Sequence, residues 1–370
     1  MKTILYICTE ATPGMIPFAT YIVKAASKSE HLDVHAITVD SYNLSFQDLL
    51  KDLPQHKIHC LKTPESRFLK IRNKFYAVNI LNKVKEIAKM YQIDVIHLLT
   101  VDYTCALILS QLKKTSRVYY TVHDVIPHEK AYTGIKDYLF AKYIRLCVKR
   151  IMRKAGCLVT NSKRQYRLMK ANYPNKNIYF HLFPPLLTDI ALSGDKTCPE
   201  LTNMKNYVLF FGNIDIYKGV EYLYKAFKNN QNLQDYHLVI AGNGPLYFTL
   251  SHNPRILFVN RYIADDEMKS LFTKSSCVVF PYISATQSGV LSIAYQFQTP
   301  ALVSDIPYFR EVDDEKCCMF FKPADAQDLS NKLEQLLFNT DLDEMKAAQK
   351  SYFANNYSEK AIITSIENIY

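Results

Sequence analysis

A lysine and two glycines near the middle of the chain are the first residues whose types and spacing suggest chemistry. Gly212 ends the apolar run 207–211, and Lys218 and Gly219 follow it just before a segment of helical character. A glycine at a strand end lets a ligand approach the backbone, the lysine adds positive charge, and a helix N-terminus adds N–H groups and its dipole. These properties suit a diphosphate. The alternative is an ordinary glycine turn followed by a surface lysine.

Two more turns follow apolar runs in the same half of the chain. Gly242 and Gly244 end the run 237–241, where ligands collect if the run is a strand of a doubly wound sheet. The loop Arg261-Tyr262-Ile263 follows the run 256–259, and we expect its backbone to contact a base and Arg261 to contact phosphate. The alternatives are a plain βα turn for the glycines and pairing with nearby carboxylates for the arginine.

A fourth segment opens a helix with small residues. Helix N-termini with serine and glycine offer unpaired N–H groups and hydroxyls to anions. The alternative is a helix simply capped by serine. The candidate pyrophosphate-holding residues in this segment are Ser288, Gly289, Val290 and Leu291.

Alternating apolar runs and helix-length segments must position these residues. This rhythm is typical of α/β folds with parallel sheets, and it starts again after the polar, proline-containing stretch 183–205. We therefore predict two Rossmann-like doubly wound domains, 1–185 and 200–349, with Asp325 capping a late helix and a last helix beginning at Asp343. The predicted strands are 4–8, 34–39, 95–99, 118–122, 157–160 and 178–182, then 207–211, 237–241, 256–259, 277–280, 301–303 and 319–321.

Composition and charge narrow the functional classes. The chain has 370 residues, 48% hydrophobic and 22% charged, and nine mostly scattered cysteines that suggest neither a zinc site nor a disulfide framework. No apolar stretch predicts a secretion signal or a membrane span. The stretch Thr9–Gly14 departs from the G-x-G-x-x-G of dinucleotide oxidoreductases. No nucleic-acid recognition motif is present, so we expect no nucleic-acid partner.

Positive charge is concentrated in the first half. Residues 1–190 hold 29 Lys and Arg against 14 Asp and Glu, and residues 138–188 hold eleven basic residues and no acidic one. Part of this region, 139–154, interleaves basic and apolar residues as a basic amphipathic helix does. We expect it to bind anionic lipid at the inner face of the plasma membrane, on an otherwise cytoplasmic protein. The alternative is a solvated helix whose apolar side packs on the core.

Taken in order, the four turns of the second half resemble the retaining glycosyltransferases of family four, which have the GT-B fold. In that family two Rossmann-like domains face each other across a cleft. The resemblance implies that 1–185 binds the acceptor, that 200–349 binds a nucleotide-sugar, and that a helix at about 350–370 packs back on the first domain. It extends to the first half through Tyr120-Thr121-Val122-His123-Asp124, which is similar to the family's T-x-H-D segment.

The same resemblance implies roles for individual residues. His123 would lie near the reactive carbon of the donor sugar, although a lone histidine there could equally be structural. Gly14 matches a glycine that admits acceptor and donor phosphate. Two family glutamates are replaced by Thr286 and Ala294, and a family arginine is missing near Asn213, which we also count among the donor-binding candidates. A branch of bacterial members has a similar A-S-Q-S-G-V segment.

The resemblance implies a hexosyltransferase-type enzyme of cell-envelope polysaccharide synthesis. The donor would be a UDP- or GDP-sugar, the acceptor a glycan or lipid-linked sugar, and the leaving diphosphate would help deprotonate the acceptor. His123, Lys218 and Arg261 are then the candidate catalytic residues. We expect metal-independent transfer without a cofactor. The rivals are a catalytically weak sugar-nucleotide-binding scaffold subunit, and an epimerase or hydrolase on the same fold.

Overall fold

The computed structural model describes residues 1–10, 15–40, 50–62, 73–125, 134–185, 187–285, 288–312 and 316–370. Its contacts divide the chain into two compact units. Unit 1 comprises 1–184 together with 359–370, and unit 2 comprises 185–358. Each unit is built on its own parallel sheet, so the predicted α/β class with two doubly wound sheets is confirmed. Gly14 and Thr286 lie outside the described residues.

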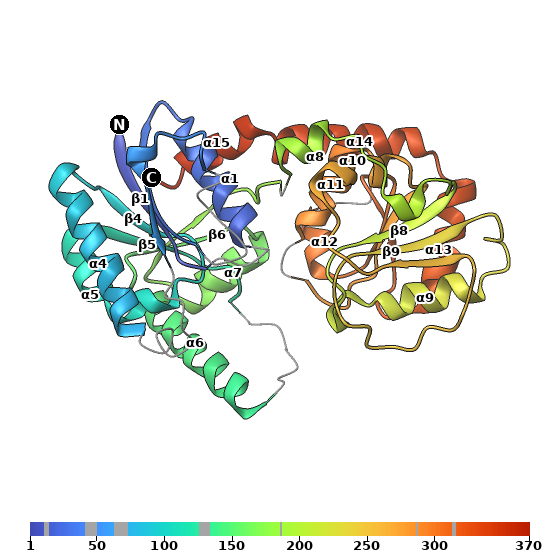
Figure 1. The fold of residues 1–370 in the computed structure, drawn as a ribbon, viewed down its shortest axis with the longest axis horizontal. Helices are drawn as coiled ribbons and strands as arrows, with labels where there is room; N and C mark the ends of the chain where they lie inside the picture. The colour runs from blue at the N-terminus through green and yellow to red at the C-terminus, as the bar shows by residue number, and fades with distance from the viewer. Residues whose placement is uncertain are drawn as a thin grey trace. The chain divides into compact units, whose positions relative to one another are not determined.

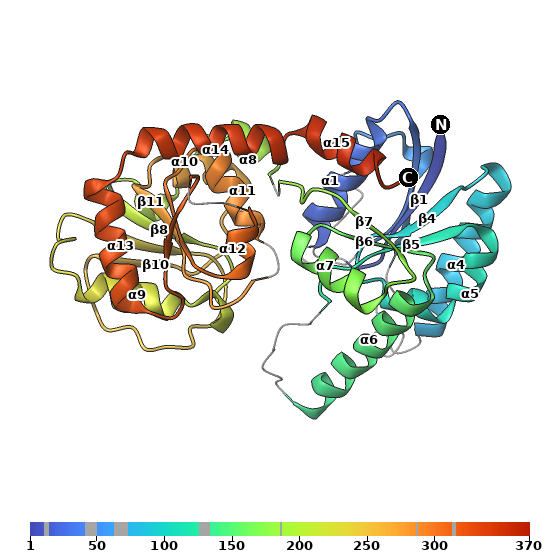
Figure 2. The same cartoon turned by 180° about the vertical axis from the view of Figure 1, so that it is seen from behind.

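The sheet of unit 1 has seven described strands in the order β3-β2-β1-β4-β5-β6-β7. Helices α4 and α5 cover one face, while α1 and α15 lie together on the other (Figures 1 and 2). The strands are β1 (Lys2–Cys8), β2 (Leu32–Asp40), β3 (Ile58–Lys62), β4 (Val95–Leu98), β5 (Arg117–Thr121), β6 (Cys157–Thr160) and β7 (Asn177–Phe180). The helices are α1 (Met15–Ser27), α4 (Asn73–Met90), α5 (Leu109–Thr115), α6 (Ile135–Lys154), α7 (Lys163–Asn172) and α15 (Glu359–Glu367).

The sheet of unit 2 has six described strands in the order β10-β9-β8-β11-β12-β13. Helices α9 and α13 pack together on one face, and α8, α10, α11 and α14 lie on the other (Figure 1). The strands are β8 (Tyr207–Phe211), β9 (His237–Ala241), β10 (Ile256–Val259), β11 (Cys277–Phe280), β12 (Ala301–Ser304) and β13 (Met319–Phe321). The helices are α8 (Asp189–Ser193), α9 (Val220–Asn229), α10 (Asp265–Thr273), α11 (Gly289–Gln296), α12 (Pro307–Val312), α13 (Ala326–Asn339) and α14 (Leu342–Asn356).

Every predicted strand is observed, because buried apolar runs fill both sheets. The strand β3 was missed. The predicted cap of α13 is present, since Asp325 accepts hydrogen bonds from the N–H groups of Gln327 and Asp328. The single helix predicted from Asp343 onward is wrong: the chain forms α14 and α15, separated at Tyr357, whose ring is buried. Residues within the stretch 183–205, which separates the two predicted runs of strands, form α8, which packs on α10 in unit 2.

The last residues of the chain belong to the core of unit 1. Tyr370 places its ring against Tyr6, His97 and Tyr119, and its hydroxyl donates to the Tyr6 hydroxyl over 3.0 Å. Helix α15 adds a hydrogen bond of 3.2 Å from the Leu182 N–H to the Ser365 hydroxyl within the same unit. The segment 359–370 is therefore an integral part of unit 1.

Candidate functional site

The carboxyl edge of the unit 2 sheet brings three of the predicted turns together. The parallel strands β8, β9 and β10 all end there, and their turns are hydrogen-bonded to each other. The Gly212 N–H donates to the Ala241 carbonyl and the Gly242 N–H to the Val259 carbonyl, both over 3.0 Å. Gly242 has φ +149°, and a Cβ atom there would lie 1.9 Å from the Gly212 carbonyl oxygen. This close approach requires glycine.

The first turn of α11 adjoins the turn after β8. A Cβ atom on Gly212 would lie 3.8 Å from a Val290 methyl group. Strands β8 and β11 are neighbours in the sheet, which explains why the segments that follow them meet. Ser288 is buried, and its side chain makes no capping hydrogen bond to the helix N-terminus. The side chain of Leu291 is buried in the core, so only its backbone is available to a ligand.

Lys218 lies between the turn after β8 and the segment leading into α11. Its ammonium nitrogen is 3.7 Å from the centre of the Tyr282 ring and 5.2 Å from that of Tyr217. The Tyr282 hydroxyl is in turn 3.4 Å from the Ser288 hydroxyl. Burial lowers the pKa of Lys218 to about 8, because the charged form loses its hydration. The structure thus connects Lys218 to the start of α11 through one aromatic ring.

Gly219 fixes the position of this lysine relative to β11. It has φ +63°, and a Cβ atom there would lie 2.0 Å from the Pro281 carbonyl oxygen. The Ile283 N–H also donates to the Tyr217 carbonyl over 2.8 Å. The Lys-Gly pair predicted from the sequence is therefore a junction between two loops. Asn213, in the turn after β8, is exposed.

Arg261 is engaged by carboxylates of its own unit. Its guanidinium donates to Glu200 at 2.8 and 2.9 Å and to Glu267 at 2.8 and 2.9 Å. Pairing with Arg261 lowers the pKa of Glu200 to about 2 and also lowers that of Glu267. This is the carboxylate-paired arrangement given above as the alternative. Contact with phosphate stays a prediction.

The two other candidate residues in the loop after β10 differ in their exposure to solvent. Tyr262 is 71% exposed, whereas Ile263 is buried in the core of unit 2. Only the backbone of Ile263 could therefore meet a base. Ala294, at the place of the second family glutamate, is fully buried in the same core.

In unit 1, His123 lies just beyond the end of β5, at the carboxyl edge of that sheet. Its Nε2 is 2.9 Å from the Leu99 carbonyl oxygen, and its ring packs edge-on against Phe18 with the ring centres 5.0 Å apart. Burial lowers the pKa of His123, so the imidazole is neutral at pH 7. The backbone of the same residue is held by Gln165, which the sequence did not single out.

A buried aspartate organises the neighbouring loop and was also missed. Asp102 accepts hydrogen bonds from the N–H and hydroxyl of Thr9 and from the N–H and hydroxyl of Thr100, at 2.6–2.8 Å. Burial raises the pKa of Asp102 to about 6, although these donors act in the opposite direction. Its left-handed backbone (φ 44°) could not be read from the sequence, although aspartate tolerates it better than most residues do.

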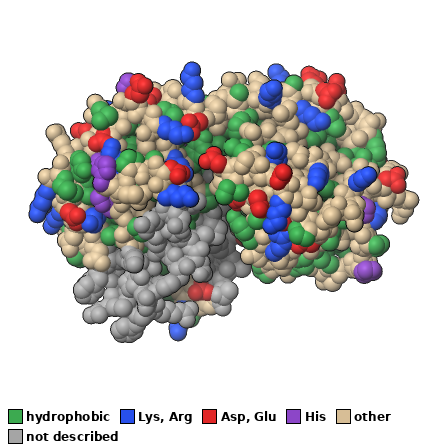
Figure 3. Space-filling model, turned by 45° about the horizontal axis from the view of Figure 1, so that its top comes forward, with side chains coloured by type: hydrophobic (Ala, Val, Ile, Leu, Met, Phe, Trp, Pro, Cys, Tyr) green, Lys and Arg blue, Asp and Glu red, His purple; other side chains and the backbone are tan. Residues whose placement is uncertain are grey.

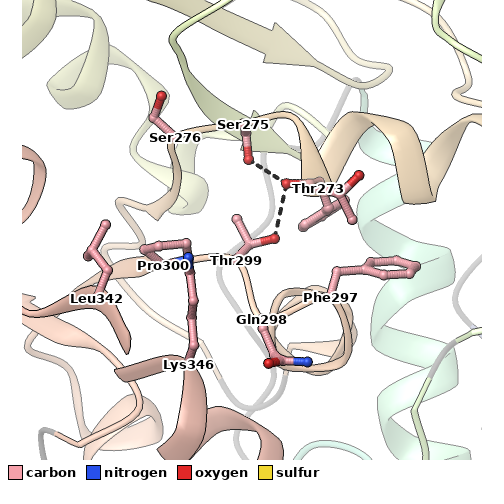
Figure 4. Close-up of a pocket in the computed structure, with 10 residues that line it drawn as sticks. Thr273, Ser275, Ser276, Phe297, Gln298, Thr299, Pro300, Leu342 and Lys346 are labelled. Carbon is pink, nitrogen blue, oxygen red and sulfur yellow. Dashed lines mark hydrogen bonds between the residues drawn. The ribbon is translucent and has the colours of Figure 1, made fainter. Parts of the chain in front are cut away.

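Two hollows in unit 2 lie away from the predicted donor residues. One, of about 400 Å³, is at the amino ends of β11 and β12, where the hydroxyls of Ser275 and Thr299 both donate to the Phe272 carbonyl (Figure 4). The other, of about 530 Å³, lies beside β13 and includes Arg310. Neither contains a residue predicted to bind the donor. Within the described ranges, no group of three or more His, Cys, Asp or Glu side chains is arranged to hold a metal ion.

The architecture is that of the GT-B glycosyltransferases. HepE from Anabaena, solved with UDP-glucose, is similar over 100% of this chain and 99% of its own, with a TM-score of 0.72 and 15% identity. Sucrose-phosphate synthase from Thermosynechococcus elongatus is similar over 100% and 98%, with a TM-score of 0.68 and 15% identity. A glycosyltransferase from Rickettsia africae is similar over 100% and 97%, with a TM-score of 0.68 and 14% identity.

The sequence itself identifies the families. Residues 18–184 match the family described as Glycosyltransferase Family 4, and residues 205–339 match Glycosyl transferases group 1. The chain is therefore built from two glycosyltransferase domains, one in each unit, as the resemblance of its turns predicted. No protein of curated function matches the sequence. None of the helices in the described ranges has the length and apolar content needed to cross a bilayer.

Proposed function

We propose that the protein is a retaining glycosyltransferase that moves a sugar from a nucleotide-sugar to a glycan or lipid-linked acceptor in cell-envelope polysaccharide synthesis. The observation that carries this proposal is the junction of Lys218, Tyr282 and Ser288 within a glycosyl transferases group 1 domain. At the carboxyl edge of the sheet, this junction combines one cation with a helix N-terminus that the Ser288 side chain does not cap. Those groups suit the diphosphate of a UDP- or GDP-sugar, and HepE was solved with UDP-glucose.

In this mechanism the bond between the anomeric carbon and the diphosphate oxygen breaks while a bond to the acceptor oxygen forms. The acceptor proton passes to the leaving diphosphate, so no protein nucleophile is required. Lys218 and the N–H groups of Gly289 and Val290 stabilise the negative charge that develops on the diphosphate. We assign Arg261 to holding the loop that carries Tyr262. His123 contributes a neutral imidazole next to the sugar.

The first test is the release of nucleoside diphosphate from a panel of UDP-, GDP- and other nucleotide-sugars, with a membrane lipid extract as acceptor. Lys218→Met removes the charge and Lys218→Arg retains it. We expect release from one donor that depends on the extract, falls at least 100-fold in Lys218→Met, and is partly retained in Lys218→Arg. Turnover unchanged by EDTA would support metal independence, and a requirement for Mg²⁺ or Mn²⁺ would contradict it.

The same assay separates the rival functions. Donor binding without turnover under any condition would favour a scaffold subunit. Turnover of the donor without any acceptor, with an epimerised or free sugar as product, would favour an epimerase or hydrolase. Product analysis by NMR also reports whether the anomeric configuration of the transferred sugar is retained.

We further propose that α6 docks the protein on an anionic membrane surface, where a lipid-linked acceptor would be presented. The helix carries seven basic residues and one acidic residue, whereas basic and acidic side chains are interspersed on the face drawn in Figure 3. Its first half extends away from the unit 1 sheet (Figures 1 and 2). Cys147 and Ile151 pack into the core, but Leu139 and Leu146 are 57% and 68% exposed.

Five of the exposed residues form one stripe. Ile135, Leu139, Lys142, Leu146 and Lys149 follow one another at helical spacing, on the side opposite to Cys147 and Ile151. Apolar residues flanked by lysines match the boundary between acyl chains and anionic headgroups.

Vesicle co-sedimentation tests this docking. We expect binding to vesicles with 30% anionic lipid, and much weaker binding to neutral vesicles. Lys142→Glu with Lys149→Glu should abolish binding, and Leu139→Ser with Leu146→Ser should weaken it. Lys350→Glu, an exposed site on α14, is the matched control and should bind as wild type. Binding that is independent of anionic lipid, or unchanged in the α6 variants, would contradict the proposal.

A further inference from the structure

The side-chain amide of Gln165 bridges two backbone groups of the loop that carries His123. Its Nε2 donates to the His123 carbonyl, and its Oε1 accepts the Val125 N–H at 2.6 Å. Gln165 is almost fully buried, and it stands in the first turn of α7, where its own N–H donates to the capping hydroxyl of Ser162 over 3.2 Å. Helix α7 thus fixes the loop through one side chain.

The Gln165 amide binds the backbone just beyond the point where the pairing of β5 with β6 ends. Pairing between β5 and β6 stops at Thr121 and Val159, and the last backbone contact is the Val122 N–H to the Val159 carbonyl at 2.8 Å. The chain beyond Val122 has left the ladder. Beyond the ladder, the Gln165 amide supplies hydrogen-bond partners to the half-buried His123 carbonyl and Val125 N–H. It also fixes the direction in which His123 leaves the strand.

The ring of His123 is oriented from its other side. The Leu99 carbonyl can only accept a hydrogen bond, so Nε2 carries the proton and Nδ1 is the acceptor nitrogen. The ring keeps this tautomer only while its backbone holds Nε2 2.9 Å from the Leu99 oxygen. The Phe18 ring packs against the imidazole ring in a T-shaped arrangement.

We propose that Gln165 is a positioning residue for His123. By bridging the backbone of His123 and Val125, Gln165 sets the direction in which the imidazole faces the sugar and the ring nitrogen that carries the proton. This inference rests on the proposed transferase function, in which His123 lines the sugar site. A purely structural role of Gln165 would affect folding without affecting the imidazole.

Two near-isosteric variants test the inference. Gln165→Leu removes both hydrogen bonds while filling similar space. Gln165→Glu accepts from the Val125 N–H but, when ionised, has no proton to donate to the His123 carbonyl. When protonated it can do both. Gln327→Glu, at an exposed position of α13, is the matched control for introducing a carboxylate.

We expect Gln165→Leu to lower kcat about 10- to 100-fold with the donor KM within about twofold, because orientation rather than binding is lost. Gln165→Glu should be as impaired at pH 8 and should recover toward wild type as the pH falls to 6. Gln327→Glu should follow the wild-type profile. A kcat of Gln165→Leu within twofold of wild type, or no recovery of Gln165→Glu at low pH, would overturn the inference.

A second measurement does not depend on turnover. In protein labelled with ¹⁵N-histidine, the His123 signals, assigned with His123→Asn, report the tautomer directly. Wild type should show the Nε2–H form, and Gln165→Leu should show a mixture of both tautomers. An unchanged spectrum would overturn the inference even in an active enzyme. A wild type without transferase activity but with the expected spectra would refute the proposed function alone.

Discussion

The ammonium nitrogen of Lys218 lies 3.7 Å from the centre of the Tyr282 ring, and this ring also reaches the hydroxyl of Ser288. The cation is therefore held by an aromatic face, and among the described residues no carboxylate forms an ion pair with it. Such a cation has no ion pair to give up when an anion binds. It also loses its proton more easily than an exposed lysine.

The affinity for UDP should therefore depend on pH. The pKa of Lys218 is lowered to about 8, so the free protein loses this charge as the pH rises from 7 to 9. We expect UDP binding, measured by calorimetry, to weaken several-fold over that range in wild type. Lys218→Arg keeps its charge and should show a flat profile. An equally steep profile in Lys218→Arg would mean that another group is responsible.

Arg261→Ala should destabilise unit 2. The substitution leaves Glu267, which is only 2% exposed, without the guanidinium that neutralises it. We expect the free energy of unfolding to fall by about 1–3 kcal/mol. Glu200→Gln should cost less, because the Glu200 side chain is 35% exposed. Urea denaturation measures both, and calorimetry with UDP separates the two roles: a loss of affinity of tenfold or more in stably folded Arg261→Ala would show a direct contact with phosphate.

Gly219→Ala should displace the Lys218 loop. The new methyl group would lie 2.0 Å from the Pro281 carbonyl oxygen in a left-handed conformation that alanine rarely adopts. We expect a loss of stability of about 1–3 kcal/mol and weaker binding of UDP. Gly134→Ala is the control, since a Cβ atom there has nothing within 4 Å. Equal melting temperatures for the two variants would refute this account.

As the pH is lowered, unit 1 should lose stability at a higher pH than unit 2. Burial lowers the pKa of five histidines, all in unit 1, whereas the unfolded chain titrates near 6.5. Below that pH the unfolded state binds protons that the folded unit does not, so stability falls as the pH drops from about 6.5 toward 4. The five are His35, His59, His97, His123 and His181, the last with a pKa of about 4.

The pair His35 and His59 offers a direct test. Their rings are stacked with centres 6.4 Å apart; Lys57 adds to the lowering of the His35 pKa and Asp33 opposes it. His35→Phe removes one titrating group and should make unit 1 less sensitive to acid. Hydrogen exchange followed by mass spectrometry suits this chain, which has no tryptophan. Equal acid sensitivity of peptides from both units would contradict the prediction.

The sequence predicted most strands because their burial is continuous, but β3 shows why this signal can fail. Its residues Ile58-His59-Cys60-Leu61-Lys62 mix apolar and polar types, as befits a strand at the edge of the described sheet. The four turns of unit 2 were also predictable, because every parallel strand ends at the same edge. The turn after β8 and the start of α11 meet because β8 and β11 are neighbouring strands.

The long-range partners could not be predicted. Gln165 follows two basic residues in an ordinary first helical turn, and its contacts lie 40 and 42 residues earlier in the chain. Glu200 is 61 residues from Arg261, so only the position of the segment before β8 reveals the pair. Side-chain pairs of this kind depend on the tertiary fold, and local composition carries no signal for them.

The discontinuity of unit 1 has a consequence for biosynthesis. The residues that complete its core, 359–370, follow the whole of unit 2 in the chain. A ribosome therefore delivers a finished unit 2 while the nascent unit 1 still lacks α15 and the ring of Tyr370 that packs against His97. In the interval, the surfaces awaiting that helix are exposed to chaperones and to other nascent chains. Although most of unit 1 is synthesised first, its core is the last to be completed.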